Sequence, residues 1–187
     1  MERWDLGLDV IERLARQDEE ALRMLMEAYG DRLHRTAFLL LKDLQAAEEA
    51  VQDTFIQAYR KIGQLQDRDK LSGWLLRILL NRCRMKQRTW SWRNLLPDMR
   101  AERDTETPEP GPEQALLLAH RQQSLHEAIG RLDYKYREVI TLYYYHELSI
   151  AAITEQLNAN ENTIKARLAR GRRLLRTILE ANEEGWS

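Results

Sequence analysis

The prolines of this chain all lie in one short stretch, and this distribution strongly constrains the fold. Among 187 residues only four are proline: Pro97, Pro108, Pro110 and Pro112. Proline disrupts helix interiors and favours extended backbone, so residues 94–112 are predicted to form a flexible, acidic, Pro-containing linker. The linker would separate an N-terminal domain, residues 1–93, from a C-terminal domain, residues 113–187.

Composition indicates that both domains are helical. Hydrophobic residues make up 43% and charged residues 32%, with eight glycines, a mixture that excludes fibrous and mostly disordered chains. The predicted fold class is therefore all-α, with two small helical domains. The single cysteine, Cys83, excludes an intrachain disulfide. We expect a cytoplasmic protein with no membrane insertion, because neither a signal peptide nor a membrane-length apolar run is evident.

The stretch from Asn162 to Leu179 contains six basic residues and no acid, although the formal net charge of the whole chain is only −1. Helical spacing places Ile164 and Leu168 on one side, and most of the basic residues opposite them. Small residues, Ala166 and Ala169, lie among the cations. Such a face can approach a DNA groove closely, but a basic helix face taken alone is more often simply solvated.

The segment immediately upstream favours the DNA interpretation. Residues 148–157 are predicted to form a short helix with Ile153 and Leu157 in the core, and residues 158–161 form a polar break. Asparagine tolerates a left-handed turn, and either Asn160 or Asn162 could cap the next helix. The C-terminal domain is therefore predicted to be a helix-turn-helix with a basic second helix.

In the N-terminal domain, three or four helices are expected. Apolar residues recur at helical spacing from Leu14 through Met26 to Leu41, and again from Val51 to Ile62. The second of these helices carries a compact polar patch, which consists of Glu48, Glu49, Gln52 and Asp53. An acidic patch is usually solvated, and it would repel DNA, so any functional partner of this patch should be a protein.

A further helix is predicted from Ser72, as its N-cap, to Arg88. Its apolar arc includes Trp74 and Met85, and Trp74 is interpreted as a core residue. A polar stripe at i, i+4, i+7 and i+11 consists of Arg77, Asn81, Arg84 and Arg88. Three arginines and an asparagine in one stripe suit phosphates and base edges, which favours nucleic acid over solvent as their partner.

These motifs together resemble those of bacterial RNA polymerase sigma factors of the extracytoplasmic-function (ECF) group. Residues 46–55 are similar to the family's acidic helix, and residues 73–81 to its tryptophan-led helix. Residues 148–172 are similar to its helix-turn-helix. The resemblance implies a sigma factor that binds core RNA polymerase, recognises minus-thirty-five and minus-ten promoter elements, and aids promoter melting. It also implies an anti-sigma factor as a regulatory partner.

The resemblance implies a role for each motif. Glu48, Glu49, Gln52 and Asp53 would bind core polymerase. The loop of residues 64–71 would hold a flipped base, and the minus-ten element would be bound by Lys70, Arg77, Asn81, Arg84 and Arg88. The minus-thirty-five element of promoter DNA would be bound by Thr163, Lys165, Ala166, Arg167, Ala169, Arg170 and Arg173.

Two other function classes compete with the sigma-factor interpretation. A stand-alone helix-turn-helix repressor or activator would share the C-terminal motif but would not need the acidic patch. An enzyme is disfavoured, because the four histidines show no metal-ligand spacing and no glycine-rich phosphate loop is present. No catalytic residue, metal or cofactor is therefore expected.

Overall fold

The computed structural model describes residues 8–65, 67–93 and 124–184 of the chain. Within these ranges every regular element is helical and none is a strand, which confirms the all-α prediction. The chain forms two compact units, residues 1–90 and 91–187. The predicted linker, residues 94–112, lies outside the described residues.

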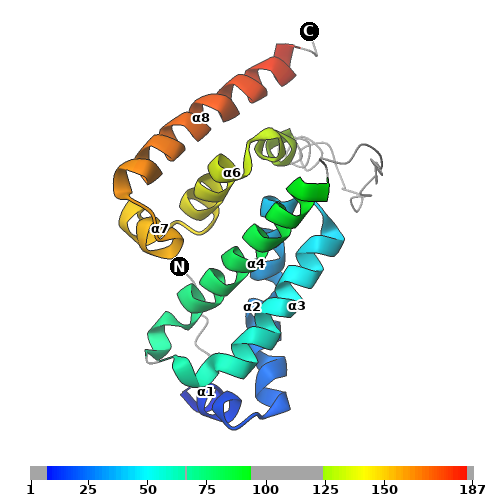
Figure 1. The fold of residues 1–187 in the computed structure, drawn as a ribbon, viewed down its shortest axis with the longest axis vertical. Helices are drawn as coiled ribbons and strands as arrows, with labels where there is room; N and C mark the ends of the chain where they lie inside the picture. Colours follow the sequence, from blue (N-terminus) through cyan, green and yellow to red (C-terminus); the bar gives the residue numbers. More distant parts are fainter. Residues whose placement is uncertain (1–7, 66, 94–123, 185–187) are drawn as a thin grey trace, which may run out of the picture. The chain divides into compact units, whose positions relative to one another are not determined.

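The first unit is a small helical bundle (Figure 1). Its elements are α1 (Leu8–Ala15), α2 (Glu19–Leu41), α3 (Leu44–Lys61), the short 3-10 turns Ile62–Gln64 and Arg68–Lys70, and α4 (Leu71–Arg93). Helix α1 packs on α2, and α2 packs on α3. The core includes the fully buried Leu25, Leu40, Leu75 and Leu79, together with Cys83.

The first apolar stretch is divided into two helices at a point that periodicity did not indicate. Gln17 adopts a left-handed φ of 64°, and Asp18 caps α2 by accepting hydrogen bonds from the backbone N–H groups of Glu20 and Ala21 at 2.9 and 3.3 Å. Arg13 donates to the Asp18 carboxylate at 2.7 Å, which lowers the pKa of Asp18. The N-cap interactions therefore end one helix and start the next, although the apolar spacing continues through the break.

Helix α4 begins and ends differently from the prediction. It starts at Leu71, so Ser72 lies inside the helix and is not its N-cap. The preceding 3-10 turn is organised by Asp67, whose carboxylate accepts from the backbone N–H of Asp69 at 3.1 Å. The helix also continues past Arg88 to Arg93, because no proline or glycine intervenes.

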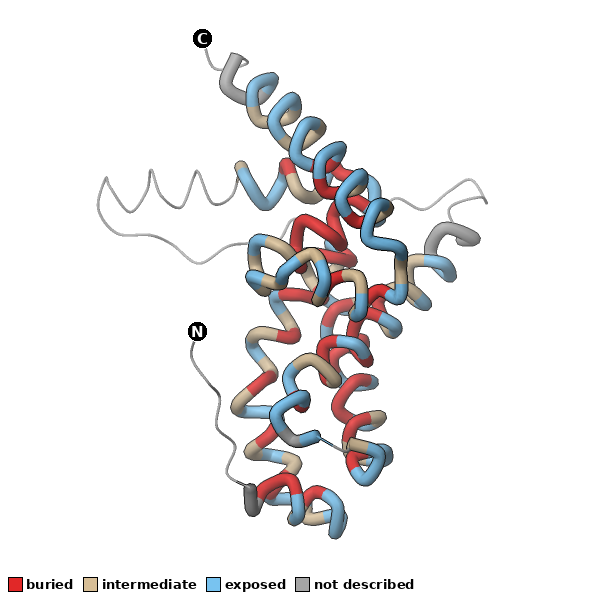
Figure 2. The backbone as a smooth tube through the Cα atoms, turned by 90° about the vertical axis from the view of Figure 1, so that its left-hand side faces the viewer, coloured by how far each residue is buried: buried red, intermediate tan, exposed pale blue. Residues whose placement is uncertain are grey.

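The second unit contains a helix over residues 124–131, α6 (Tyr134–Ile140), a π-helical turn (Thr141–Tyr145), α7 (Ile150–Leu157) and α8 (Glu161–Glu184). Leu132, Tyr136, Ile140 and Leu168 form its buried cluster, with Leu175 and Ile178 packed against it. As predicted, Ile164 and Leu168 face this core. Buried positions recur along the helices of both units with exposed positions between them (Figure 2).

One buried cation helps to join the helices of the second unit. Arg137 is only 4% exposed, and its guanidinium donates to the Gly130 carbonyl at 3.1 Å. Burial lowers the pKa of this guanidinium. Its Nε has no hydrogen-bond partner in the part of the chain that the structure describes. Arg137 thus ties α6 to the end of the preceding helix and does not face solvent.

Candidate nucleic-acid and polymerase interfaces

The helix-turn-helix is present and its turn rests on two asparagines. Asn158 ends α7 in a left-handed conformation, with φ 47° and ψ 52°. Asn160 caps α8 by accepting from the backbone N–H of Asn162 at 2.8 Å, so Asn160 and not Asn162 is the capping residue. Helix α7 starts at Ile150, two residues later than predicted, because the Ser149 hydroxyl caps it. Ile153 and Leu157 are buried as predicted.

Helix α8 carries all of the residues predicted to bind the minus-thirty-five element. Five of them are exposed (Lys165, Ala166, Ala169, Arg170 and Arg173), and two are half-buried (Thr163 and Arg167). Lys165 forms an ion pair with Glu161 at 2.6 Å. Both partners are more than half exposed, so this pair contributes little and can exchange for a phosphate contact.

A cluster at the side of α8 was not predicted. The Arg172 guanidinium carbon lies 4.9 Å from the ring centroid of Tyr143 and 5.5 Å from that of Tyr144. These tyrosines come from the π-helical turn between α6 and α7. The run of three consecutive tyrosines, residues 143–145, was visible in the sequence, but helical periodicity could not show which of them meets Arg172.

Helix α4 presents the predicted polar stripe. Arg77, Asn81 and Arg88 are exposed, Arg84 is half-buried, and Lys70 is exposed in the turn just before the helix. Two residues of the predicted apolar arc lie beside this stripe: Met85 is 58% exposed, and Trp74, which was interpreted as a core residue, is only half-buried. The buried face of α4 is centred on Leu75, Leu79 and Cys83. The centre of this face lies about a third of a turn or more around the helix from Trp74 and Met85.

Helix α3 carries the four residues predicted to bind polymerase, and all four are exposed. They are not equivalent, however. The Glu49 carboxylate accepts from Lys86 of α4 at 2.6 Å, which lowers the pKa of Glu49. Gln57 of α3 also accepts a hydrogen bond from Arg82 of α4. Glu49 therefore belongs to the α3–α4 contact, whereas Glu48, Gln52 and Asp53 face outward.

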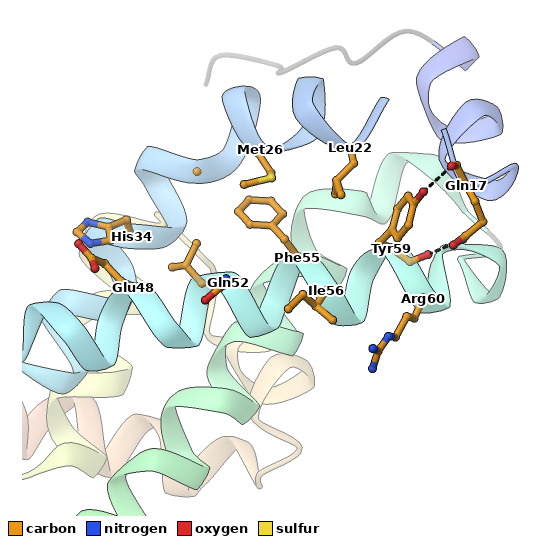
Figure 3. Close-up of a pocket in the computed structure, with 12 residues that line it drawn as sticks. Gln17, Leu22, Met26, His34, Glu48, Gln52, Phe55, Ile56, Tyr59 and Arg60 are labelled. Atoms are coloured by element: carbon orange, nitrogen blue, oxygen red, sulfur yellow. Dashed lines mark hydrogen bonds between the residues drawn. The ribbon is translucent and has the colours of Figure 1, made fainter. Parts of the chain in front are cut away.

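Sequence reasoning missed a groove of about 830 Å³ between α2 and α3 (Figure 3). Met26, which belongs to the apolar pattern of its helix, is 46% exposed there, and Ile56 is 43% exposed. His34 and Glu48 lie at one end of the groove, and Gln17 and Tyr59 form mutual hydrogen bonds at the other. Ile56 could have been noticed in the sequence, because it is an apolar residue between Gln52 and Arg60 on the polar side of its helix.

The Glu49–Lys86 pair gives a pH-dependent prediction. Since folding lowers the pKa of Glu49, its stabilising effect is present above the unfolded pKa and is lost as the pH falls through the folded pKa. Glu49→Gln should therefore slightly lower the melting temperature at neutral pH, and this difference should vanish in acid. Thermal unfolding followed by circular dichroism measures it, and a difference that persists unchanged in acid would contradict the role of the carboxylate charge.

None of the described helices is both long and apolar enough to cross a membrane. Among the described residues, no three His, Cys, Asp or Glu side chains are grouped so that they could hold a metal ion.

Comparison with known proteins identifies both halves of the chain. The family "Sigma-70 region 2" matches residues 25–93, and "Sigma-70, region 4" matches residues 122–175. The first match includes the helices α3 and α4, and the second includes the helix-turn-helix. The two regions lie in the same order as the motifs described above.

Relatives of known type align over most of the chain. The ECF RNA polymerase sigma factor SigW of Bacillus subtilis is 30% identical, with 90% of this chain and 94% of SigW covered. The RNA polymerase sigma-H factor of Pseudomonas aeruginosa is 26% identical, with 91% of this chain and 92% of the sigma-H factor covered.

Solved structures share the fold. The sigma factor RpoE of Bartonella quintana, in complex with the anti-sigma factor NepR, has a TM-score of 0.67 and 22% identity, with 84% of this chain and 96% of RpoE covered. CnrH, in complex with the cytosolic domain of CnrY, has a TM-score of 0.63 and 24% identity, with 92% of this chain and 96% of CnrH covered. The chain belongs to the ECF group of RNA polymerase sigma factors, which bind RNA polymerase and direct transcription initiation at promoters.

Proposed function

We propose that this sigma factor recognises promoters at two places, through α8 at the minus-thirty-five element and through α4 at the minus-ten element. The observation that carries the proposal is the exposed basic face of α8, which is the capped second helix of the helix-turn-helix. Such a second helix enters the major groove, where long cations reach base edges and phosphates. The exposed Ala166 and Ala169 allow the backbone of α8 to approach the DNA closely.

The stripe on α4 would bind the minus-ten strand. Arg77, Arg84 and Arg88 supply cations for phosphates, and Asn81 supplies an amide for base edges. The exposed Met85 and half-buried Trp74 add an apolar surface beside the stripe, which suits bases separated from their stack. We propose that the loop of residues 64–71 accepts a flipped base and so aids melting, although residue 66 lies outside the described residues.

Helix α3 would bind core polymerase through Glu48, Gln52 and Asp53. Glu48 and Gln52 also line the groove between α2 and α3, where Met26 and Ile56 are exposed. An apolar groove that carries Glu48 at one end, beside the exposed Asp53, matches a partner helix with an apolar and basic surface. The polar patch and the groove therefore form one continuous candidate surface for polymerase, and Glu49 contributes mainly by fixing α3 against α4.

We extend three further expectations to this chain. The sigma factor RpoE was co-crystallised with the anti-sigma factor NepR, which supports an anti-sigma factor as a partner here. The acidic linker, residues 94–112, would follow the path of RNA in the polymerase, where its carboxylates imitate a nucleic-acid strand. The chain would act as a non-catalytic subunit in the cytoplasm, together with the polymerase.

Run-off transcription tests the promoter proposal. Core RNA polymerase would be incubated with fragmented genomic DNA in the presence and absence of the chain. We expect discrete new start sites that share two upstream sequence elements at constant spacing. Start sites that share only one element would contradict bipartite recognition. No new transcripts, with no co-elution with core polymerase, would instead support a stand-alone helix-turn-helix regulator.

Substitutions on α8 assign the minus-thirty-five contacts. Lys165→Ala and Arg170→Ala are each expected to weaken promoter binding by about 1–3 kcal/mol if the side chain contacts a base edge, and by less if it contacts only phosphate. Binding of the chain–polymerase complex to promoter fragments and to fragments with a scrambled upstream element measures the difference. An equal loss on both fragments would assign the residue to phosphate, and no loss on either would exclude it from the interface.

A further inference from the structure

We propose that Arg172, Tyr143 and Tyr144 form a phosphate-binding cluster that contacts the DNA backbone beside the groove entered by α8. The inference rests on the proposed role of α8 at the minus-thirty-five element, and it assigns DNA contacts to a different element, the π-helical turn Thr141–Tyr145. None of these three residues is among those that the sequence analysis assigned to the minus-thirty-five element.

The geometry of the cluster is compact. The two tyrosine rings meet edge to face, with centroids 5.0 Å apart and planes inclined by 76°. The Arg172 guanidinium lies over both rings, at 4.9 and 5.5 Å from their centroids. Cation–π contacts of this kind restrain an otherwise mobile arginine side chain. Tyr144 is nevertheless 56% exposed, so the cluster lies at the surface.

The π-helical turn explains why two consecutive tyrosines reach the same arginine. The backbone N–H of His146 donates to the Thr141 carbonyl at 3.2 Å, and that of Leu148 donates to the Leu142 carbonyl at 3.1 Å. The widened turn keeps Thr141 and Leu142 buried while Tyr143 is half-buried and Tyr144 is exposed. π-Helical turns are rare and frequently lie at functional sites.

Arg172 is placed on the same side of α8 as the proposed DNA contacts. It follows Lys165 by seven residues and Ala169 by three, so these residues form one row along the helix. The cations in this row differ in their partners. Lys165 pairs with Glu161 and Arg176 pairs with Glu180, but no carboxylate among the described residues forms an ion pair with Arg172.

Phosphate is the ligand that suits this arrangement. A guanidinium that lies over aromatic rings keeps its fork of N–H donors, which can form two parallel hydrogen bonds to a phosphate. A tyrosine hydroxyl can donate a third. The neighbouring row of cations and small residues favours DNA phosphate over a carboxylate of a protein partner, because a duplex can contact the row and the cluster together.

The test uses the full chain bound to core polymerase and two labelled duplexes: a promoter fragment from the run-off experiment, and the same fragment with its upstream element scrambled. Arg172→Ala should weaken binding to both duplexes by about tenfold, and should reduce the slope of affinity against salt by about one. Tyr144→Phe, which keeps the ring, should weaken binding by about three- to tenfold. Arg172→Lys should retain the salt slope, because the charge is kept. It should lose affinity, because a lysine ammonium cannot form the two parallel hydrogen bonds that a guanidinium forms with a phosphate.

Tyr145→Phe is the matched control, because its ring contacts His146 and not Arg172, and it should bind like the unaltered chain. Unchanged affinity and salt slope for Arg172→Ala and Tyr144→Phe would overturn the inference, as would a loss confined to the promoter duplex. If these variants bind DNA normally but lose an anti-sigma partner, the cluster is a protein contact and the inference is wrong. Lys165→Ala, measured in parallel, separates the two proposals, because it tests the role of α8 without affecting the cluster.

Discussion

Replacing Gln52 and Asp53 together with alanine is expected to weaken binding to core RNA polymerase by about 30-fold or more, which corresponds to the loss of one interface hot spot. Both side chains are exposed on α3. Gln52 also lines the groove between α2 and α3. Since neither side chain supports the core, the folded structure should be unaffected. Binding of the labelled chain to purified core polymerase, at constant salt, measures the change.

Glu49→Ala provides a matched control for that double variant. It removes a carboxylate from the same helix, but one that Lys86 already engages at 2.6 Å. We therefore expect a smaller loss of polymerase affinity and a slightly lower melting temperature. If Glu49→Ala weakens binding as strongly as the double variant, then the surface that contacts polymerase extends across the α3–α4 contact. If the double variant binds normally, the assignment of Gln52 and Asp53 is wrong.

The groove allows the apolar part of the same surface to be tested separately. Ile56 is 43% exposed and lines the groove between two polar positions of the same helix face. A large exposed apolar residue contributes little to the free energy of folding but can contribute strongly to an interface. The polar patch on α3 and the groove between α2 and α3 together present both charge and apolar area to a large partner.

The sequence was sufficient to predict the elements that depend on local patterns. Helical spacing predicted the inner face of α8, with Ile164 and Leu168. The polar break of residues 158–161 predicted a turn in which an asparagine can be left-handed, and the structure shows that this residue is Asn158. The two-domain organisation was predicted from proline placement. These features depend on residues close together in the chain, for which propensity and periodicity are informative.

The incorrect predictions involve competition between local signals or contacts between distant residues. Asp18 ended one helix inside a continuous apolar pattern, because a cap outweighs periodicity over a few residues. Met26 and Met85 matched the apolar pattern but are exposed, since the edge of an apolar arc can lie outside the core. The pairing of Glu49 with Lys86 joins residues from different helices, and neither charge pattern indicated it.

Gly171 shows how tightly α8 must pack for its basic face to be positioned. A Cβ atom at this position would lie 3.2 Å from Cγ1 of Ile140 and 3.4 Å from Cβ of Tyr136, so α8 approaches α6 closely here. Ile140 and Tyr136 are themselves buried, at 2% and 8% exposure, and have little room to move. The absence of a side chain at Gly171 is therefore what allows the two helices to come together.

Gly171→Leu is accordingly expected to lower the free energy of unfolding of the second unit by about 3 kcal/mol, the upper part of the range for overpacked cores. Hydrogen exchange followed by mass spectrometry should show a loss of protection in residues 124–184. Protection in residues 8–93 should be unchanged. For Gly171→Ala the clash with Ile140 opposes a gain of about 1 kcal/mol in helix propensity, so a small net change is expected.

Gly30→Ala is the control for helix propensity alone, because nothing lies within 4 Å of the Cβ it would add in α2. It should raise the stability of the first unit by about 0.5–1 kcal/mol. If Gly171→Leu also raised the free energy of unfolding, the conclusion that α8 packs too closely on α6 to accept a side chain at this position would be wrong. Since Arg172 directly follows Gly171, the displaced helix in Gly171→Leu should also lose promoter binding while polymerase binding through α3 is retained. That combination would separate the positioning of α8 from the binding of polymerase.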